Sequence, residues 1–304
     1  MATAGVSTVF DNSTDALYRA WISQIMADLT AVGWVQTAHT GQIDPLTVLK
    51  PTGAFQQGGY SIWTPNDGLT PFYLRIGFGS SAAGALSPGI LVSASWDLAS
   101  LTAGINFAGV NLSHHYQLFG TNANAGVTCT PKLCKVGSAC WFQWHDANPG
   151  GGNTNHAFGI DRWRDEDGTP NEDGFHLIAA GCGDSRTVHN HDTGGGTQYT
   201  AIDSVPHPSV GGPAHNYGNS RVPYAAPNVS SSWGYGGNVG VAPIHPWYGG
   251  AKGAMLCAVI GSPTDFAAVG ATTSVTIHGA AHTFNRTEAR PDSSGFGRYL
   301  MLWE

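Results

Sequence analysis

The stretch at residues 58–95 constrains the fold more than any other part of the chain. It reads GGYSIWTPNDGLTPFYLRIGFGSSAAGALSPGILVSAS, with apolar runs at 60–63, 72–78 and 89–94. The middle run alternates two sets of residues: Phe72, Leu74, Ile76 and Phe78 against Tyr73, Arg75 and Gly77. This is the period of a strand with one buried face. Pro65-Asn66-Asp67-Gly68 forms a turn between the first two runs, so the stretch predicts an antiparallel meander. Gly77 and Gly79 predict a bulge or a close backbone approach.

Residues 12–32 predict one N-terminal amphipathic helix. Asn12 or Ser13 can cap its start and Gly33 follows its end. One face collects apolar side chains at spacings of three and four, and neighbouring apolar residues broaden it. The first set is Leu17, Trp21, Ile25, Leu29 and Val32, and the broadening set is Tyr18, Ile22 and Met26. We expect this helix to lie across a sheet.

Further apolar runs predict strands at 34–37, 139–144, 254–260, 273–277 and 299–303. Residues 156–163 and 174–180 predict a hairpin around a long acidic loop at 164–173. The predicted fold is mainly β: an antiparallel β-sandwich-like domain with one amphipathic helix and long Gly/Pro-rich loops. We expect a core at 1–182, a loop-rich extension at 183–253 that wraps a neighbouring subunit, and C-terminal strands at 254–304 that complete the core.

The chain is poor in charge. Charged residues make up 11% of the sequence, against roughly 25% in soluble domains. The formal charge of −7 is spread without a basic stripe, which argues against nucleic-acid binding. Such a surface is expected where much of it is buried against partner subunits. The alternative is a monomer coated with small polar residues.

Nothing in the sequence predicts a membrane protein. The start, Met1-Ala2-Thr3-Ala4-Gly5, lacks a basic segment followed by an apolar core. No apolar run approaches the ~18 residues of a membrane span. We therefore expect synthesis in a cytoplasm and no membrane insertion.

The five cysteines leave two alternatives open. Cys129, Cys134 and Cys140 are spaced by five and six residues, which does not match paired zinc ligands. A disulfide within this cluster, Cys129–Cys134 or Cys134–Cys140, is one possibility in a particle that matures outside the cell. Free packed thiols are the other, and we favour them.

Two stretches resemble metal sites. His189 and His191, with Asp192 beside them and Asp184 or His176 nearby, could hold a transition metal. Asp165 and Asp167, followed by Gly168 and Asp173, could hold a looser cation site, although the EF-hand order is absent. In both cases we favour a solvated polar loop and predict no cofactor.

The sequence carries no catalytic motif. There is no G-x-S-x-G elbow, P-loop or dinucleotide fingerprint. Carboxylates between residues 161 and 173 could be proposed as a glycosidase pair, but nothing fixes their separation. We predict that the protein is not an enzyme.

Aromatic residues in the extension suggest a binding surface. We predict that Trp233, Tyr235, Trp247 and Tyr248 act as interface anchors. The alternative is that exposed Trp and Tyr residues stack on sugar rings, as in a carbohydrate-binding module.

The segments ALYRAWISQI, GWVQT, TGQID, VLKPTG, GGYSIWTPNDGL, PFYLRIGFGS and PGILVSAS occur in this order between residues 10 and 95. This part resembles structural proteins of tailed bacteriophages, and the segment at 156–181 resembles them more loosely. The resemblance implies a β-rich virion component without catalysis, made in the host cytoplasm and assembled with copies of itself and other virion proteins. The expected placement is the tail, baseplate or neck. The alternatives are a receptor- or glycan-binding tail module, a head decoration protein and a polysaccharide-degrading enzyme.

Overall fold

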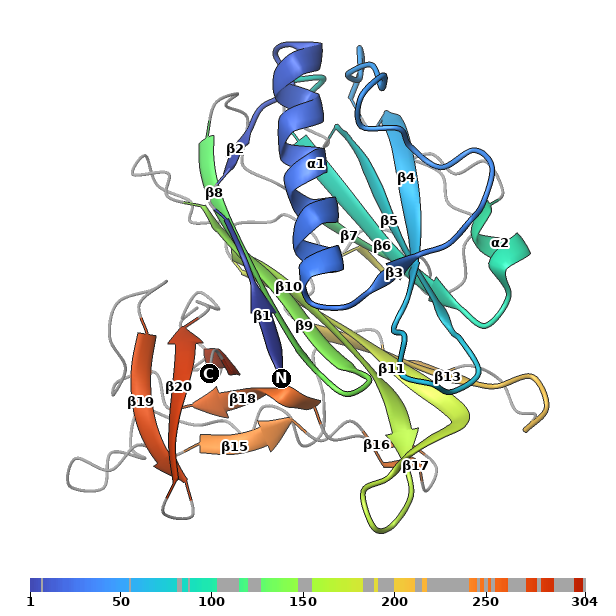
Figure 1. Ribbon diagram of the computed structural model, residues 1–304, viewed down its shortest axis with the longest axis vertical. Helices are drawn as coiled ribbons and strands as arrows, with labels where there is room; N and C mark the ends of the chain where they lie inside the picture. The colour runs from blue at the N-terminus through green and yellow to red at the C-terminus, as the bar shows by residue number, and fades with distance from the viewer. Residues whose placement is uncertain are drawn as a thin grey trace.

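The protein is mainly antiparallel β, with two helices among the residues that the structure describes. The computed structural model describes residues 1–6, 8–54, 56–80, 84–86, 88–102, 115–119, 127–146, 155–182, 189–190, 200–210, 215–217, 241–244, 247–248, 251–252, 255–261, 272–277, 280–286 and 298–302. The strands form three sheets, which we name the meander sheet, the hairpin sheet and the C-terminal sheet. The first two enclose the main core in a sandwich-like arrangement (Figure 1).

The meander sheet has the strand order β12-β7-β6-β5-β4-β3. Its members are β3 (Val35–Gln36), β4 (Gln57–Thr64), β5 (Tyr73–Ser80), β6 (Pro88–Ser95), β7 (His115–Phe119) and β12 (His189–Asn190). β4, β5 and β6 pair antiparallel in succession, so the predicted meander is confirmed. The alternation in the middle run is also confirmed, because its first set of residues lies in the main core: Phe72, Leu74, Ile76 and Phe78.

The bulge lies one strand away from its predicted position. The register between β4 and β5 shifts between Gln57 and Gly59, opposite Gly79 and Phe78. A β-carbon at Gly58 would clash with the Tyr18 hydroxyl. The close approach therefore brings the helix against β4 and requires glycine there.

The hairpin sheet follows the order β1-β8-β9-β10-β11-β13-β14, with β2 on β8 and the pair β16–β17 on β10. Its strands are β1 (Ala2–Ala4), β2 (Thr8–Phe10), β8 (Val127–Val136), β9 (Ala139–Asp146), β10 (Asn155–Arg164), β11 (Pro170–Cys182), β13 (Thr200–Pro206), β14 (His215–Tyr217), β16 (Trp247–Tyr248) and β17 (Ala251–Lys252).

The predicted hairpin is present, but its loop is shorter than expected. β10 and β11 pair regularly from Asn155 and Cys182 to Arg162 and Phe175. After a register irregularity Arg164 pairs with Pro170, which leaves five residues, 165–169, between the two strands. In the irregular part of β11, Glu172 Oε1 accepts a hydrogen bond from the Thr70 amide at 2.6 Å. The acidic segment therefore begins close to the end of the regular pairing, and the strands continue beyond that point to Arg164 and Pro170.

Helix α1 (Asp15–Ala31) begins later than the sequence suggested. Thr14 is the N-cap, with its Oγ1 accepting from the Leu17 amide at 3.2 Å, so neither Asn12 nor Ser13 caps the helix. Asn12 instead donates to the Gly79 carbonyl and accepts from Trp21 Nε1. The buried apolar side chains all belong to the predicted face: Tyr18, Trp21, Ile22, Ile25 and Leu29. Leu17, predicted on the same face, is exposed. Gly33 follows the helix with φ of 88°, as predicted.

α1 packs against the opening between the two sheets (Figure 1). Trp21 of the helix contacts both sheets. Its ring lies 5.0 Å from that of Phe10 in β2 and 5.7 Å from that of Phe78 in β5, centroid to centroid. At the far end of the core, the ring of Phe72, which directly precedes β5, lies 5.0 Å from that of Phe175 in the hairpin sheet, centroid to centroid. A short second helix, α2 (Leu98–Thr102), lies over the opposite face of the meander sheet, where Leu101 joins Ile62 and Leu91.

The C-terminal strands form a sheet of their own. Its order is β15-β18-β21-β20-β19, made of β15 (Val241–Ile244), β18 (Met255–Gly261), β19 (Thr272–Ile277), β20 (Ala280–Arg286) and β21 (Arg298–Leu302). β18 contacts β8, β9 and β10, so this sheet packs beside the hairpin sheet. Sheet membership also cuts across the predicted segments, since β13 and β14 extend the hairpin sheet and β15 joins the C-terminal sheet.

Candidate functional site

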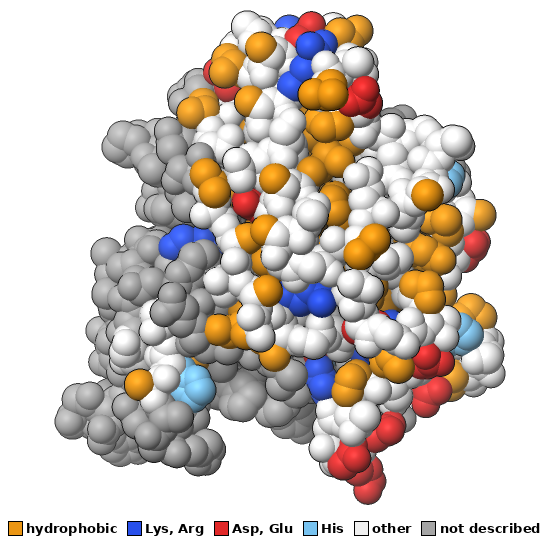
Figure 2. Space-filling model, viewed as in Figure 1, with side chains coloured by type: hydrophobic (Ala, Val, Ile, Leu, Met, Phe, Trp, Pro, Cys, Tyr) orange, Lys and Arg blue, Asp and Glu red, His pale blue; other side chains and the backbone are white. Residues whose placement is uncertain are grey.

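Exposed leucines gather at the end of the molecule where α1 begins. Leu46 and Leu49, in the loop between β3 and β4, are 79% and 66% exposed. Two further leucines are exposed at the same end. Leu17 belongs to the first turn of α1, and Leu86 follows Ala85, whose carbonyl accepts a hydrogen bond from Asn12. Figure 2 shows hydrophobic side chains there, interspersed with charged ones. We name these four leucines the apolar end.

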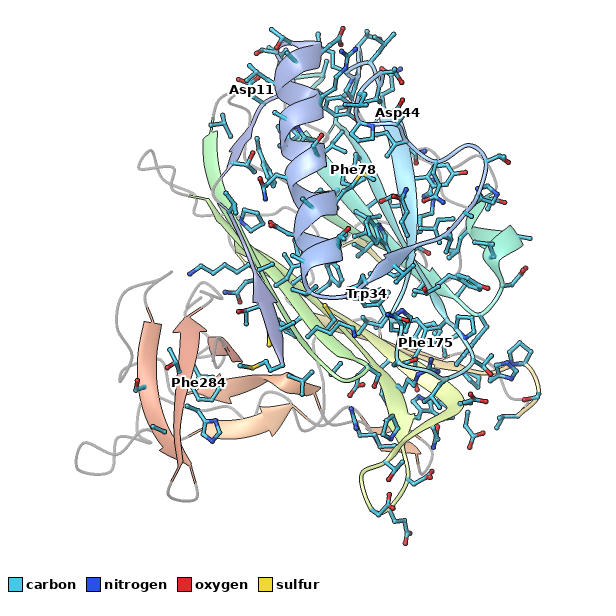
Figure 3. The ribbon with its side chains drawn as sticks, viewed as in Figure 1. Asp11, Trp34, Asp44, Phe78, Phe175 and Phe284 are labelled. Atoms are coloured by element: carbon cyan, nitrogen blue, oxygen red, sulfur yellow. The ribbon has the colours of Figure 1, made fainter. Side chains whose placement is uncertain are left out.

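Hydrogen bonds fix the loop that carries Leu46 and Leu49. The carboxylate of Asp44 accepts from the Leu46 amide at 2.9 Å and from Thr47 Oγ1 at 3.1 Å. α1 holds the other half of the loop: Asp15 Oδ1 accepts from the Lys50 amide at 2.9 Å, and Arg19 Nε donates to the Val48 carbonyl at 2.7 Å. Asp44 lies beside the start of the helix in Figure 3. The two leucines are therefore presented by an ordered loop.

Arg75 is a fully buried cation on the face of the meander sheet that is turned away from the main core. Its cross-strand neighbours are Ile62 on β4 and Ser93 on β6. The guanidinium carbon lies 4.3 Å from the centroid of the Tyr60 ring, and Nη2 donates to Gln57 Oε1 at 3.0 Å. Nε and Nη1 have no hydrogen-bond partner. Sequence alternation placed Arg75 correctly on the outward face, but it gave no signal of burial.

The charge of Arg75 lacks an acidic partner among the described residues, whose ion pairs involve other arginines. Burial lowers the pKa of Arg75 to about 10. The guanidinium therefore keeps its charge at neutral pH in a place that disfavours it.

Arg162 is equally buried but neutralised. Its Nε and Nη2 form a bidentate pair with the two carboxylate oxygens of Asp67 at 2.6 and 3.0 Å, and Nη2 also donates to the Thr70 carbonyl at 2.8 Å. The guanidinium lies over the rings of Phe72 and Trp96. Since Asp67 belongs to the β4–β5 turn and Arg162 to β10, the pair joins the two sheets of the sandwich.

An aspartate, a histidine and a serine lie side by side on adjacent strands of the hairpin sheet, on the face turned away from the main core. The register places Asp161 of β10 opposite His176 of β11, and His176 opposite Ser204 of β13. All three are buried. Trp163 lies beside them over Gly174, where a β-carbon would clash with the indole ring.

The row does not form a catalytic relay. Asp161 accepts instead from Ser138 Oγ at 2.7 Å and from Arg164 Nη2 at 2.9 Å. Neither ring nitrogen of His176 has a hydrogen-bond partner, and the same holds for Ser204 Oγ. Burial lowers the pKa of His176 to about 3 and raises that of Asp161 to about 6, although Arg164 opposes the second shift. A serine nucleophile needs a bonded base and access to substrate, and this buried row provides neither.

The acidic residues of the β10–β11 loop stabilise a turn. Asp165 Oδ1 accepts from Asn171 Nδ2 at 2.7 Å, and Asp167 Oδ1 accepts from the Thr169 amide at 2.8 Å. Among the described residues, no three His, Cys, Asp or Glu side chains group as metal ligands would.

The histidine candidates do not come together within the described residues. His189 lies in β12 of the meander sheet, whereas His176 lies in β11 of the hairpin sheet. Asp184, His191 and Asp192 lie outside the described residues.

The structure shows Cys134 and Cys140 as free, buried thiols. Cys134 pairs with Trp141, the residue next to Cys140, so the two thiols point to opposite faces of the sheet. Burial raises the pKa of Cys140 to about 12, which keeps it protonated. Neither proposed disulfide is present, because both require Cys134; of Cys129 only the backbone, in β8, is described.

Two of the four predicted interface aromatics fall within the described backbone. Trp247 and Tyr248 form β16, which pairs with β17. Trp233 and Tyr235 lie outside the described residues.

Comparison with known protein families and with curated proteins finds no match to this sequence. Within the described part of the chain, no helix combines the length and apolar character needed to cross a membrane.

Proposed function

We propose that the protein is a non-enzymatic structural component of a tailed-bacteriophage particle, present in several copies in the tail, baseplate or neck. The observation that carries this proposal is the pair of exposed leucines, Leu46 and Leu49, on a loop fixed by Asp15, Arg19 and Asp44. The low charge of the chain and the phage-like order of its N-terminal segments support the same proposal.

A fixed apolar loop suits subunit assembly for an energetic reason. Contacts between proteins lose free energy when loops and side chains must be ordered on binding. Here the loop backbone is ordered before contact, so burial of its leucines contributes more of its free energy to association. We propose that the apolar end contacts a second copy of this chain, in keeping with the low charge of the sequence.

The test measures the mass of the purified protein by light scattering and sedimentation. We expect an assembly of several copies for the wild type and a monomer for the double variant Leu46→Asp/Leu49→Asp, because two carboxylates would be buried unpaired in the interface. Val210→Asp is the matched control, since Val210 is also exposed but lies after β13. A wild-type monomer, or an assembly that the double variant leaves intact, would contradict the proposal.

Placement in the particle requires a second measurement. Gold-labelled antibody against the protein should bind purified particles at one end for a tail, baseplate or neck component. Label over the whole head would instead indicate decoration. Absence of label and of the protein from dissociated particles would exclude a structural role.

A further inference from the structure

Among the described buried arginines, Arg75 differs from the other two. Arg162 pairs with Asp67, and Arg164 pairs with Asp161. Arg75 is 0% exposed, and neither its Nε nor its Nη1 has a hydrogen-bond partner. An ionised group removed from water without a counter-charge costs several kcal/mol, so this arrangement is incomplete.

We propose that Arg75 is the anchor of an oxyanion-binding site that accepts a carboxylate or phosphate group. The guanidinium presents planar N–H donors in a fork that matches either group. A neutral ligand would satisfy the donors but leave the charge, and a cation would be repelled. An oxyanion supplies both hydrogen-bond acceptors and the missing negative charge.

The surroundings hold the guanidinium in place for such a ligand. The Tyr60 ring stacks on one of its faces at 4.3 Å, and Gln57 Oε1 accepts from Nη2. Both contacts come from β4, whereas Arg75 extends from β5. Orientation is therefore set by the pairing of two strands at the centre of the meander sheet, and Nε and Nη1 remain for the ligand.

The site is independent of the proposed assembly surface. Arg75 faces away from the main core, beside Ile62 of the cluster that α2 covers, whereas the apolar end lies where α1 begins. Because the guanidinium is buried, an anion reaches it only after local opening of the chain around it. We therefore expect slow binding and equilibrate samples over many hours before measurement.

The test uses the full chain with two probes, inorganic phosphate and glucuronate, at ionic strength held constant with sodium chloride. For the wild type we expect saturable binding by equilibrium dialysis of labelled probe. Above the dissociation constant, the unfolding midpoint should rise by about 2 °C per tenfold increase of the probe. Arg75→Gln should lose binding at least 10-fold, and Arg75→Lys should bind more weakly than wild type because it lacks the fork. The matched control is Lys135→Gln, which removes a cation from β8, a strand of the hairpin sheet.

The two probes distinguish the chemical source of the anion. Binding of phosphate alone identifies a phosphate-bearing ligand, and binding of glucuronate alone identifies a carboxylate such as that of an acidic sugar. No saturable binding of either probe would overturn the proposal, as would equal binding by wild type and Arg75→Gln. If Arg75→Gln fails to fold, equal binding by wild type and Arg75→Lys would overturn it. None of these results depends on the oligomeric state.

Discussion

Arg75 and Arg162 show two ways in which a sheet can bury an arginine. Both side chains are 0% exposed and both guanidinium groups lie over aromatic rings. Arg162 has a bidentate carboxylate and a backbone carbonyl, with only Nη1 lacking a hydrogen-bond partner, and it joins two sheets. Arg75 has an amide oxygen on Nη2 and orphaned Nε and Nη1 atoms. The difference shows that burial alone does not tell a neutralised arginine from one without a carboxylate partner; the hydrogen bonds do.

The largest expected effect comes from removing the counter-charge of Arg162. Asp67→Ala leaves that guanidinium buried and unpaired, and breaking such a pair costs about 3–5 kcal/mol of unfolding free energy. Urea denaturation measures the loss. Glu166→Gln, in the exposed β10–β11 loop, is the control and should stay within about 0.5 kcal/mol of wild type. A loss below about 1 kcal/mol for Asp67→Ala would mean that water replaces the carboxylate.

A smaller effect is expected from His176, which is buried without any hydrogen-bond partner. Its folded pKa of about 3 lies below the ordinary 6.5, so the unfolded chain binds the proton more tightly. The contribution of His176 to the free energy of unfolding is complete at high pH and decreases as the pH drops below about 6.5. Relative to His176→Phe, the wild type should lose about 2 kcal/mol between pH 7.5 and pH 5.

The pH dependence of wild-type stability must be compared with that of His176→Phe, because titration of Asp161 changes stability in the opposite direction. Its pKa is raised to about 6, so its contribution increases as the pH falls through 6 toward the unfolded value. Denaturation of both proteins across this range separates the two groups. Parallel pH profiles for wild type and His176→Phe would show that His176 has a polar partner in solution.

The smallest effect, with the opposite sign, is expected at Arg75. Without added anion, Arg75→Met removes an unpaired buried charge and keeps an apolar stem, and it should stabilise the protein by about 1 kcal/mol. Phosphate or glucuronate should reverse the order, because it stabilises the wild type and not the variant. Destabilisation of the variant by more than about 2 kcal/mol in anion-free buffer would show that the chain itself supplies the acid.

The sequence predicted correctly the features that depend only on residues close together in the chain. The alternation through Phe72, Leu74, Ile76 and Phe78 identified the buried face of β5, and Gly33 identified the end of α1. The start of the helix was missed because Asn12, Ser13 and Thr14 are all acceptable caps. The choice depended on tertiary bonds from Asn12 to the Gly79 carbonyl and Trp21. The same tertiary packing buries the broadened side of the predicted helix face, at Tyr18, and leaves Leu17 exposed.

By itself, therefore, the sequence determined a mainly β chain, the order of the strands along the meander, and which face of β5 meets the main core, because the period of side chains depends on the backbone alone. Only the tertiary structure decided that the C-terminal strands form a third sheet and that Cys134 and Cys140 point to opposite faces. It also decided that Arg162 meets Asp67, whereas no acid among the described residues pairs with the buried Arg75. These outcomes depend on which residues distant in sequence meet in space, such as Asp67 and Arg162, and no local pattern encodes such a meeting.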